Sequence, residues 1–222
     1  MRTAKLDRLA DSWGRGICRR QTAGLASLVI VGAMVQAILA AETPSVLIVY
    51  HRGDPAVRHS PPLDEGAIDG FTQATTREVN VEAIARELQR RLEARNVRVV
   101  LRRVEAVREP KDLLAFDGIV IGSPVWFSNV AYPVKRFFDT HLIRLYEHRA
   151  ERLNDKVMSG FCTAMEHGES GPRGLQALMW GIEHLTDRRV EGLVIQTGEA
   201  PDQWKKKVDA FAARLVLSLK AN

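Results

Sequence analysis

Apolar runs of strand length alternate with amphipathic segments over most of this sequence, and this alternation constrains the fold more than any other feature. Five runs are predicted as strands, at 46–50, 97–101, 116–122, 156–163 and 190–195. The segments between them carry apolar residues at helical spacing, as in Val81, Ile84, Leu88 and Leu92. Continuous apolar strands are typical of parallel sheets covered on both faces. The alternation therefore predicts an α/β domain.

The number and order of these elements narrow the topology. Right-handed crossovers leave only a few doubly wound arrangements. For five parallel strands we expect the order 2-1-3-4-5, with a switch point between the first and third strands. Ligands of such sheets bind beyond the carboxyl ends of the strands at this point. The segments after Tyr50, Gly122 and Thr163 are therefore the candidate binding loops.

Three local features are predicted to mark the ends of elements. Ser123-Pro124 is expected to end the third strand. Residues 168–174 are rich in glycine and are predicted as a loop, with an amphipathic helix after it. Thr75 and Glu78 have the spacing of a capping box before the first helix of the domain.

Residues 1–44 are predicted to lie outside the domain, as an export signal or a membrane anchor. Arg19 and Arg20 precede an uncharged stretch, 21–41, that is long enough to span a bilayer. The basic flank predicts the N-terminus in the cytoplasm and the domain, 45–222, outside it. Cleavage near Ala41 would give an exported, periplasmic protein, and retention would give an anchored one. Both alternatives stay open.

The basic character of the chain belongs largely to this leader. The sequence has 222 residues and a net charge of +5. The first 41 residues hold six of its 32 basic and two of its 27 acidic residues, which leaves residues 42–222 at about +1. A nearly neutral domain lacks the basic surface typical of nucleic-acid binding, so no nucleic-acid partner is expected. The histidines form no metal-binding pattern, so no metal is expected.

Cys162 is the one cysteine of the predicted domain, because Cys18 lies in the leader. A disulfide within the domain is therefore not expected. Cys162 lies within an apolar strand pattern, which favours a small buried side chain over a reactive thiol.

A long match to a known family begins at Phe116 and ends at Asp139, with the sequence FDGIVIGSPVWFSNVAYPVKRFFD. This segment resembles the flavodoxin-like superfamily. There it typically contains Asp-Gly, three apolar residues and Gly-Ser/Thr-Pro-any-Tyr, followed by a helix with Pro-Val/Met-Lys-any-Phe-any-Asp. The branch of NADPH-dependent FMN reductases and NAD(P)H:quinone oxidoreductases is the most similar. The resemblance covers about 46–219 and implies that the domain binds flavin mononucleotide (FMN).

The loop after the third strand supplies the first candidate flavin contacts. The rings of Trp126 and Phe127 would form a flat wall for the flavin, and backbone amides of 124–129 would reach its pyrimidine edge. Packing that only closes the end of the sheet is the alternative. The candidate cofactor-binding residues of this loop are Ser123, Pro124, Val125, Trp126, Phe127 and Asn129.

The loop after the fourth strand, TAMEHGESGPRG, resembles the flavin-edge loop of the quinone oxidoreductase branch. It keeps the His-Gly pair of that branch as His167-Gly168, but not the Gly-Gln that follows. The resemblance implies flavin contacts for Thr163, His167 and Gly168. His167 is also a candidate contact to a substrate.

The loop after the first strand departs from the family. Flavodoxins place a phosphate loop, Ser/Thr-any-Thr-Gly-any-Thr, at this position before a helix N-terminus. This chain instead has Tyr50-His51-Arg52-Gly53 and about twenty additional residues. Loss of the phosphate site, with Thr75 only capping the helix, is the alternative to phosphate binding. The candidate phosphate contacts are the hydroxyls of Thr72, Thr75 and Thr76 and the guanidinium groups of Arg52 and Arg77.

Together these features predict an exported or membrane-anchored FMN-binding protein, either a flavin-dependent oxidoreductase or an electron-transfer protein. The flavin carries the redox chemistry, so no catalytic side chain is assigned. A quinone, NAD(P)H or an electron-transfer protein would be the redox partner, and export disfavours NAD(P)H because it is scarce outside the cytoplasm. The alternative is a flavin-free binding or structural module with the same fold. Membrane contact is expected only through an uncleaved leader, and homo-oligomer formation is left open.

Overall fold

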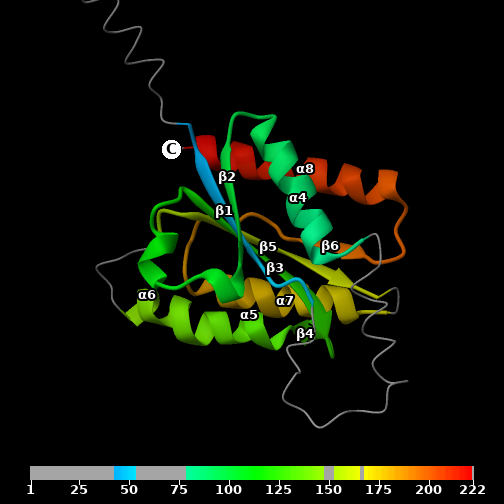
Figure 1. The fold of residues 1–222 in the computed structure, drawn as a ribbon, viewed down its shortest axis with the longest axis horizontal. Helices are drawn as coiled ribbons and strands as arrows, with labels where there is room; N and C mark the ends of the chain where they lie inside the picture. Colours follow the sequence, from blue (N-terminus) through cyan, green and yellow to red (C-terminus); the bar gives the residue numbers. More distant parts are fainter. Residues whose placement is uncertain (1–42, 54–78, 148–152, 166–167, 222) are drawn as a thin grey trace, which may run out of the picture. The chain divides into compact units, whose positions relative to one another are not determined.

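Five parallel strands form the central sheet of the computed structural model, which describes residues 43–53, 79–147, 153–165 and 168–221 (Figure 1). The strands are β1 (Ser45–Tyr50), β2 (Arg98–Arg103), β3 (Gly118–Trp126), β5 (Val157–Ala164) and β6 (Leu193–Gln196). Their order across the sheet is β2-β1-β3-β5-β6. This order confirms the predicted doubly wound arrangement of the parallel strands. A further strand, β4 (Asn129–Val130), pairs antiparallel to β3 and was not predicted.

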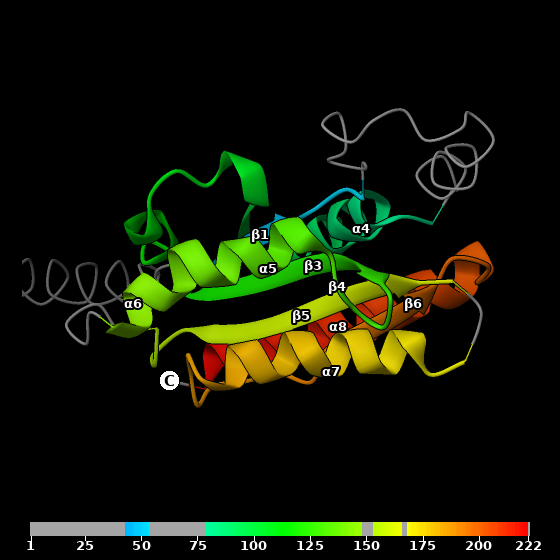
Figure 2. The ribbon, with the colours of Figure 1, turned by 90° about the horizontal axis from the view of Figure 1, so that it is seen from below.

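Helices cover both faces of this sheet (Figure 2). One face carries α4 (Val81–Glu93) and α8 (Pro201–Lys220). The other face carries α5 (Tyr132–Phe137), α6 (Ile143–Glu147) and α7 (Ser170–Glu183). The π-helical turn η3 (Phe138–Leu142) joins α5 to α6, and the 3-10 turns η1 (Val104–Ala106) and η2 (Pro110–Leu113) follow β2. No helix in the described part of the chain is both long and apolar enough to cross a membrane.

The side chains of β1 show how the sheet divides the core. Val46, Ile48 and Tyr50 belong to the cluster beneath α4 and α8. Leu47 and Val49 belong to the cluster beneath α5 and α7. Side chains alternate along a strand, so a strand covered on both faces must be apolar at every position. The continuous apolar run that predicted this strand is the consequence.

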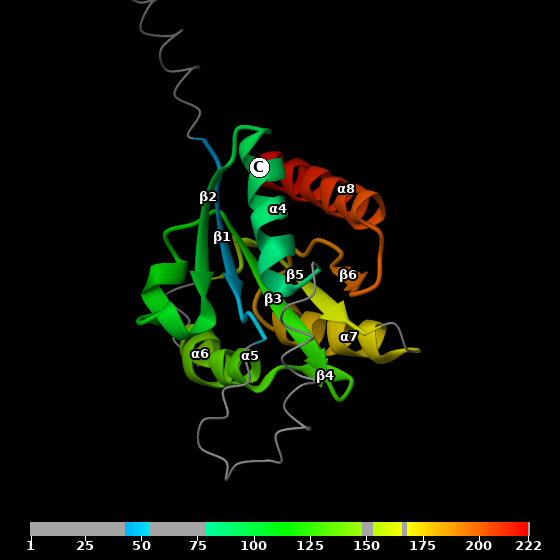
Figure 3. The same ribbon diagram turned by 45° about the vertical axis from the view of Figure 1, so that its right-hand side comes forward.

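The strand register brings three carboxyl ends to one edge of the sheet (Figure 3). Tyr50, the last residue of β1, lies opposite Gly122 of β3. Pro124 of β3 lies opposite Thr163 of β5. The predicted binding loops after β1, β3 and β5 therefore start at the same edge.

The third strand continues beyond Ser123-Pro124, and the prediction that it ends there is wrong. The carbonyl of Gly122 faces β1 and accepts a hydrogen bond from the His51 amide at 3.1 Å. Backbone groups alternate sides along a strand, so Pro124 faces the same side as Gly122, beyond the end of β1. The N–H that proline lacks would have had no strand partner there, so Pro124 interrupts no ladder.

The prediction of a glycine-rich loop at 168–174 is also wrong, because α7 begins at Ser170. Two of its glycines allow the helix to approach the sheet closely. A Cβ on Gly171 would lie 2.8 Å from Val194 Cγ1, and a Cβ on Gly174 would lie 2.5 Å from Val125 Cγ2. Pro172 falls in the first helical turn, where the amide it lacks would have no helical partner.

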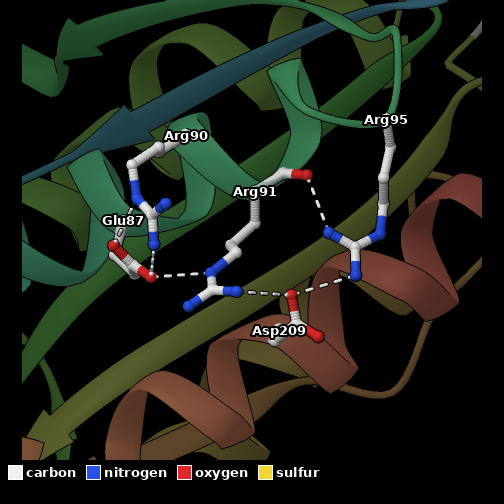
Figure 4. Close-up of polar contacts among 5 residues, drawn as sticks. All are labelled: Glu87, Arg90, Arg91, Arg95 and Asp209. Carbon is white, nitrogen blue, oxygen red and sulfur yellow. Dashed lines mark hydrogen bonds and ion pairs between the residues drawn. The ribbon is translucent and has the colours of Figure 1, made fainter.

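A charged network joins α4 to α8 (Figure 4). Asp209 of α8 accepts hydrogen bonds from Arg91 at 3.1 Å and from Arg95 at 2.9 Å. Arg91 also donates to Glu87 at 2.7 Å. Hydrogen bonds, first from Arg90 and then from Arg91, lower the pKa of Glu87. The network fixes the position of α4, whose N-terminus lies beside the end of β1.

Candidate functional site

A β-hairpin extends from the carboxyl edge of the sheet at the end of β3. Trp126 pairs with Asn129, and the turn between them consists of Phe127 and Ser128. Both turn residues have positive φ angles, 50° and 61°. Such a two-residue turn matches the twist of the two strands but requires a conformation that side chains other than those of Gly and Asn rarely adopt. The turn holds the ring of Phe127 in solvent, with 98% of its surface exposed.

Trp126 lies beside the end of β1, at the predicted switch point. Its side chain is half-buried. The ring meets that of His51 edge to face, with 5.7 Å between the centroids and 88° between the planes. The sequence predicted an aromatic wall at this edge, and the structure places one aromatic ring next to β1 and the other, Phe127, at the tip of the hairpin.

His51 is a candidate functional residue that the sequence analysis did not select. It directly follows β1 and is 4% exposed. Its Nδ1 lies 2.6 Å from Oε1 of Glu105, a residue of η1. Its Nε2 is buried and has no hydrogen-bond partner within the described residues. The position of His51 directly after the first predicted strand was recognisable from the sequence, but its pairing with Glu105 was not.

The residues of β3 just before the hairpin turn contact the protein interior. The hydroxyl of Ser123 is fully buried, donates to the Pro124 carbonyl at 2.8 Å and accepts from the Ala131 amide at 3.0 Å. Ala131 is the N-cap residue of α5, so Ser123 connects β3 to the start of that helix. Val125 packs against α7 at Gly174. Of the predicted contacts in this loop, only Ser123 is buried; Phe127 and Asn129 are exposed, and the partly exposed residues are Pro124, Val125 and Trp126.

The loop after β5 is only partly described. Thr163 is buried and lies between Pro124 and Ile195 in the sheet. Gly168 precedes α7, is exposed and has a φ of 67°. His167 lies outside the described residues.

Cys162, next to Thr163, is fully buried. Burial raises the pKa of its thiol to about 12. A thiol in this environment stays protonated and unreactive at neutral pH, which confirms the predicted packing role.

The N-terminus of α4 is capped by a side chain of the protein itself. Asn80, and not Thr75, caps this helix, because its Oδ1 accepts from the Ala83 amide at 2.9 Å. The capping-box prediction is therefore wrong. Thr72, Thr75, Thr76 and Arg77 lie outside the described residues.

Arg52, a predicted phosphate contact, is paired with a carboxylate at this helix start. Its Nε lies 3.4 Å from Oε2 of Glu82, in the first turn of α4. Arg86 binds the same carboxylate at 2.6 Å. Two guanidinium groups therefore share this carboxylate beside the end of β1.

Two cavities lie away from this edge. One of about 570 Å³ is lined by residues of α6 and the end of α7, including Leu145 and His184. Another of about 820 Å³ lies between α7 and β6, beside Met179 and Gly192. We place the candidate site at the carboxyl edge because the buried imidazole, the exposed aromatic rings and the switch point occur together there.

No protein-family model matches the sequence, and no curated protein is significantly similar to it. Solved structures do resemble it. An oxidised flavodoxin 1 from Bacillus cereus is 14% identical, with a TM-score of 0.56 over 78% of this chain and 97% of that one. A short-chain flavodoxin associated with a bacterial microcompartment is 15% identical, with a TM-score of 0.58 over 80% and 99%.

A WrbA-like protein from Agrobacterium tumefaciens is 17% identical, with a TM-score of 0.53 over 81% of this chain and 99% of that one. The match covers nearly the whole length of each of these three proteins. The chain therefore has the flavodoxin-like fold.

Proposed function

We propose that this domain binds FMN at the carboxyl edge of β1 and β3 and acts as a flavin-dependent oxidoreductase or an electron-transfer protein. The position of Trp126 supports the proposal most strongly. It places a half-buried aromatic ring at the topological switch point, where doubly wound sheets bind their ligands. The fold shared with flavodoxins supports the same cofactor.

The residues at this edge suit a flat, partly apolar ring system with polar edges. Trp126 and Phe127 offer aromatic surface, and the amides of the hairpin turn offer hydrogen-bond donors. The unpartnered Nε2 of His51 offers a buried polar contact. When bound, FMN would supply the electron-transfer chemistry, and these residues would bind it, orient it and limit the access of water.

We also propose that the protein acts outside the cytoplasm. The proposal depends on Arg19, Arg20 and the uncharged stretch 21–41, which lie outside the described residues. Because NAD(P)H is scarce in that compartment, a quinone or an electron-transfer protein suits the site better as the redox partner. The sequence resemblance to FMN reductases and quinone oxidoreductases, described above, is part of the same proposal. Fractionation of cells, with protease added to intact spheroplasts, tests the location.

Flavin binding is tested by visible absorption of the full chain after incubation with FMN and removal of the excess. A retained flavin spectrum supports the proposal, and a folded but colourless protein refutes it. Trp126→Ala should weaken FMN binding roughly tenfold, because stacking on an aromatic ring is lost. Trp180→Ala is the matched control, since Trp180 is 60% exposed on α7. Equal affinity of the two variants would refute the role of Trp126.

A flavin-free binding module is the second candidate, and the start of α4 favours it. Asn80 occupies one of the free amides of this helix, and Glu82 places a carboxylate in the first turn. Both features weaken the anion site that helix N-termini usually provide. Under this alternative, FMN would not raise the melting temperature of the protein.

A further inference from the structure

Four large apolar side chains are exposed on the helices that cover one face of the sheet. They are Tyr132 on α5, Ile143 and Tyr146 on α6 and Trp180 on α7, and their exposed fractions run from 41% for Ile143 to 64% for Tyr132. Among the described residues of α4 and α8, on the opposite face, one large apolar side chain is exposed, that of Leu217. A single exposed apolar side chain is ordinary, but several on neighbouring helices indicate a surface that binds a partner.

The four side chains belong to one surface, because their helices lie side by side (Figure 2). Both α5 and α7 return from the carboxyl edge of the sheet, so they run in the same direction. Phe138, directly after α5, packs so closely on α7 that a Cβ on Gly181 would lie 2.5 Å from its ring. Tyr132 precedes Phe138 in the chain and Ile143 follows it. This contact therefore places Trp180, the neighbour of Gly181, at a level between those two residues.

The area of this α5–α7 surface suits an interface of ordinary size. At ~200 Å² for a large side chain, the exposed parts of the four residues amount to about 400 Å². A specific protein interface buries about 800 Å² on each partner, of which a little more than half is apolar. The four side chains therefore supply most of the apolar area that one side of such an interface needs.

The charges of the α5–α7 surface favour a second copy of the chain as the partner. Residues 132–147 and 169–183 hold four basic and four acidic side chains, and pairs such as Arg173 with Glu169 form within the surface. A surface without net charge does not repel an identical surface. In contrast, α8 carries five basic and two acidic residues, so two copies would repel each other there.

We propose that two copies of this chain form a dimer through the α5–α7 surface. In a two-fold symmetric dimer the same surface of each copy meets its equivalent, so Trp180 and the three other side chains are buried twice. The inference goes beyond the proposed function and does not depend on flavin binding.

The test is sedimentation velocity of the full chain between about 1 µM and 100 µM, because interfaces of this size associate with micromolar or tighter affinity. The unmodified chain should sediment as a dimer whose fraction falls on dilution. Trp180→Glu should weaken the dimer roughly a hundredfold or more, since each copy loses a buried aromatic ring and gains a charge at the contact. Leu217→Glu, at a position of α8 that is 71% exposed, is the matched control and should leave the dissociation constant unchanged.

Two outcomes would overturn the inference. One is a monomer throughout this concentration range. The other is a dimer that Trp180→Glu leaves intact, because association would then use another surface, residues 1–44 included. Circular dichroism checks that each variant folds. If Trp180→Glu does not fold, Ile143→Lys decides the question by the same measurement, because it places a charge in the same surface from α6.

Discussion

Gly174 offers a quantitative test of how closely α7 packs on the β3–β4 hairpin. Alanine at this position would place a Cβ 2.5 Å, 2.9 Å and 3.2 Å from Cγ2, Cγ1 and Cβ of Val125. Rotation of a β-branched side chain moves its methyl groups but leaves its own Cβ in place, so the clash cannot be relieved without a shift of the backbone. Overpacking of this kind costs about 1–3 kcal/mol.

The same substitution also has a favourable effect. Alanine stabilises a helix interior by about 1 kcal/mol relative to glycine. We therefore expect Gly174→Ala to reduce the free energy of unfolding by ~0–2 kcal/mol. In a Val125→Ala background the contacts to Cγ2 and Cγ1 at 2.5 Å and 2.9 Å are removed and only the 3.2 Å contact to Cβ remains, so the same change should stabilise the protein by up to about 1 kcal/mol. The coupling between the two sites should then be about 1–3 kcal/mol.

Urea unfolding of the four chains, followed by circular dichroism, measures this coupling, provided that the dependence of the free energy on urea is unchanged. Gly168→Ala is the control. Its Cβ would meet no atom within 4 Å, and its φ of 67° would cost about 1–2 kcal/mol whatever occupies position 125. If Gly174→Ala stabilises the unmodified chain, or if its effect simply adds to that of Val125→Ala, the close packing inferred here is refuted.

Three further predictions concern residues with defined partners. Ser123→Ala should reduce the free energy of unfolding by about 1–3 kcal/mol, because it leaves the buried Ala131 amide without an acceptor; a neutral effect in urea unfolding would contradict the role of this hydroxyl. Asp209→Asn should cost about 1 kcal/mol in low salt and less in 1 M NaCl, where charges are screened; a loss that does not depend on salt would exclude an electrostatic origin. Burial raises the pKa of the Cys162 thiol from 9.0 to about 12, so between these pH values the unfolded chain loses a proton that the folded chain retains. Stability should therefore be unaffected by this group below pH 9 and fall as the pH rises toward 12, and Cys162→Ala should flatten that fall in unfolding measurements at several pH values.

Periodicity in the sequence was sufficient to predict the architecture of the domain. The apolar run of β1 is continuous because both of its faces are covered, and this dual burial is visible in the sequence alone. Right-handed crossovers then left few ways to order five parallel strands, and the observed order is the expected one. The same reasoning identified the sheet edge at which Trp126 lies, and the apolar surroundings of Cys162 predicted its burial.

The tertiary structure alone decided how particular residues are used. Glycines at 171 and 174 favour a loop by local propensity, but both lie inside α7. The close contacts that they allow with Val194 and Val125 outweigh their low helix propensity. The sequence predicted that Ser123 contacts the cofactor, yet its hydroxyl hydrogen-bonds within the protein, to the Pro124 carbonyl and the Ala131 amide.

The pairing of His51 with Glu105 joins residues 54 positions apart in the sequence. Nothing in either local pattern indicates it, because the contact exists only once β1 and the turn after β2 end at the same edge of the sheet. The sequence thus determined which layers and strands form. Packing between distant segments determined which polar groups are satisfied within the protein and which remain available to a ligand.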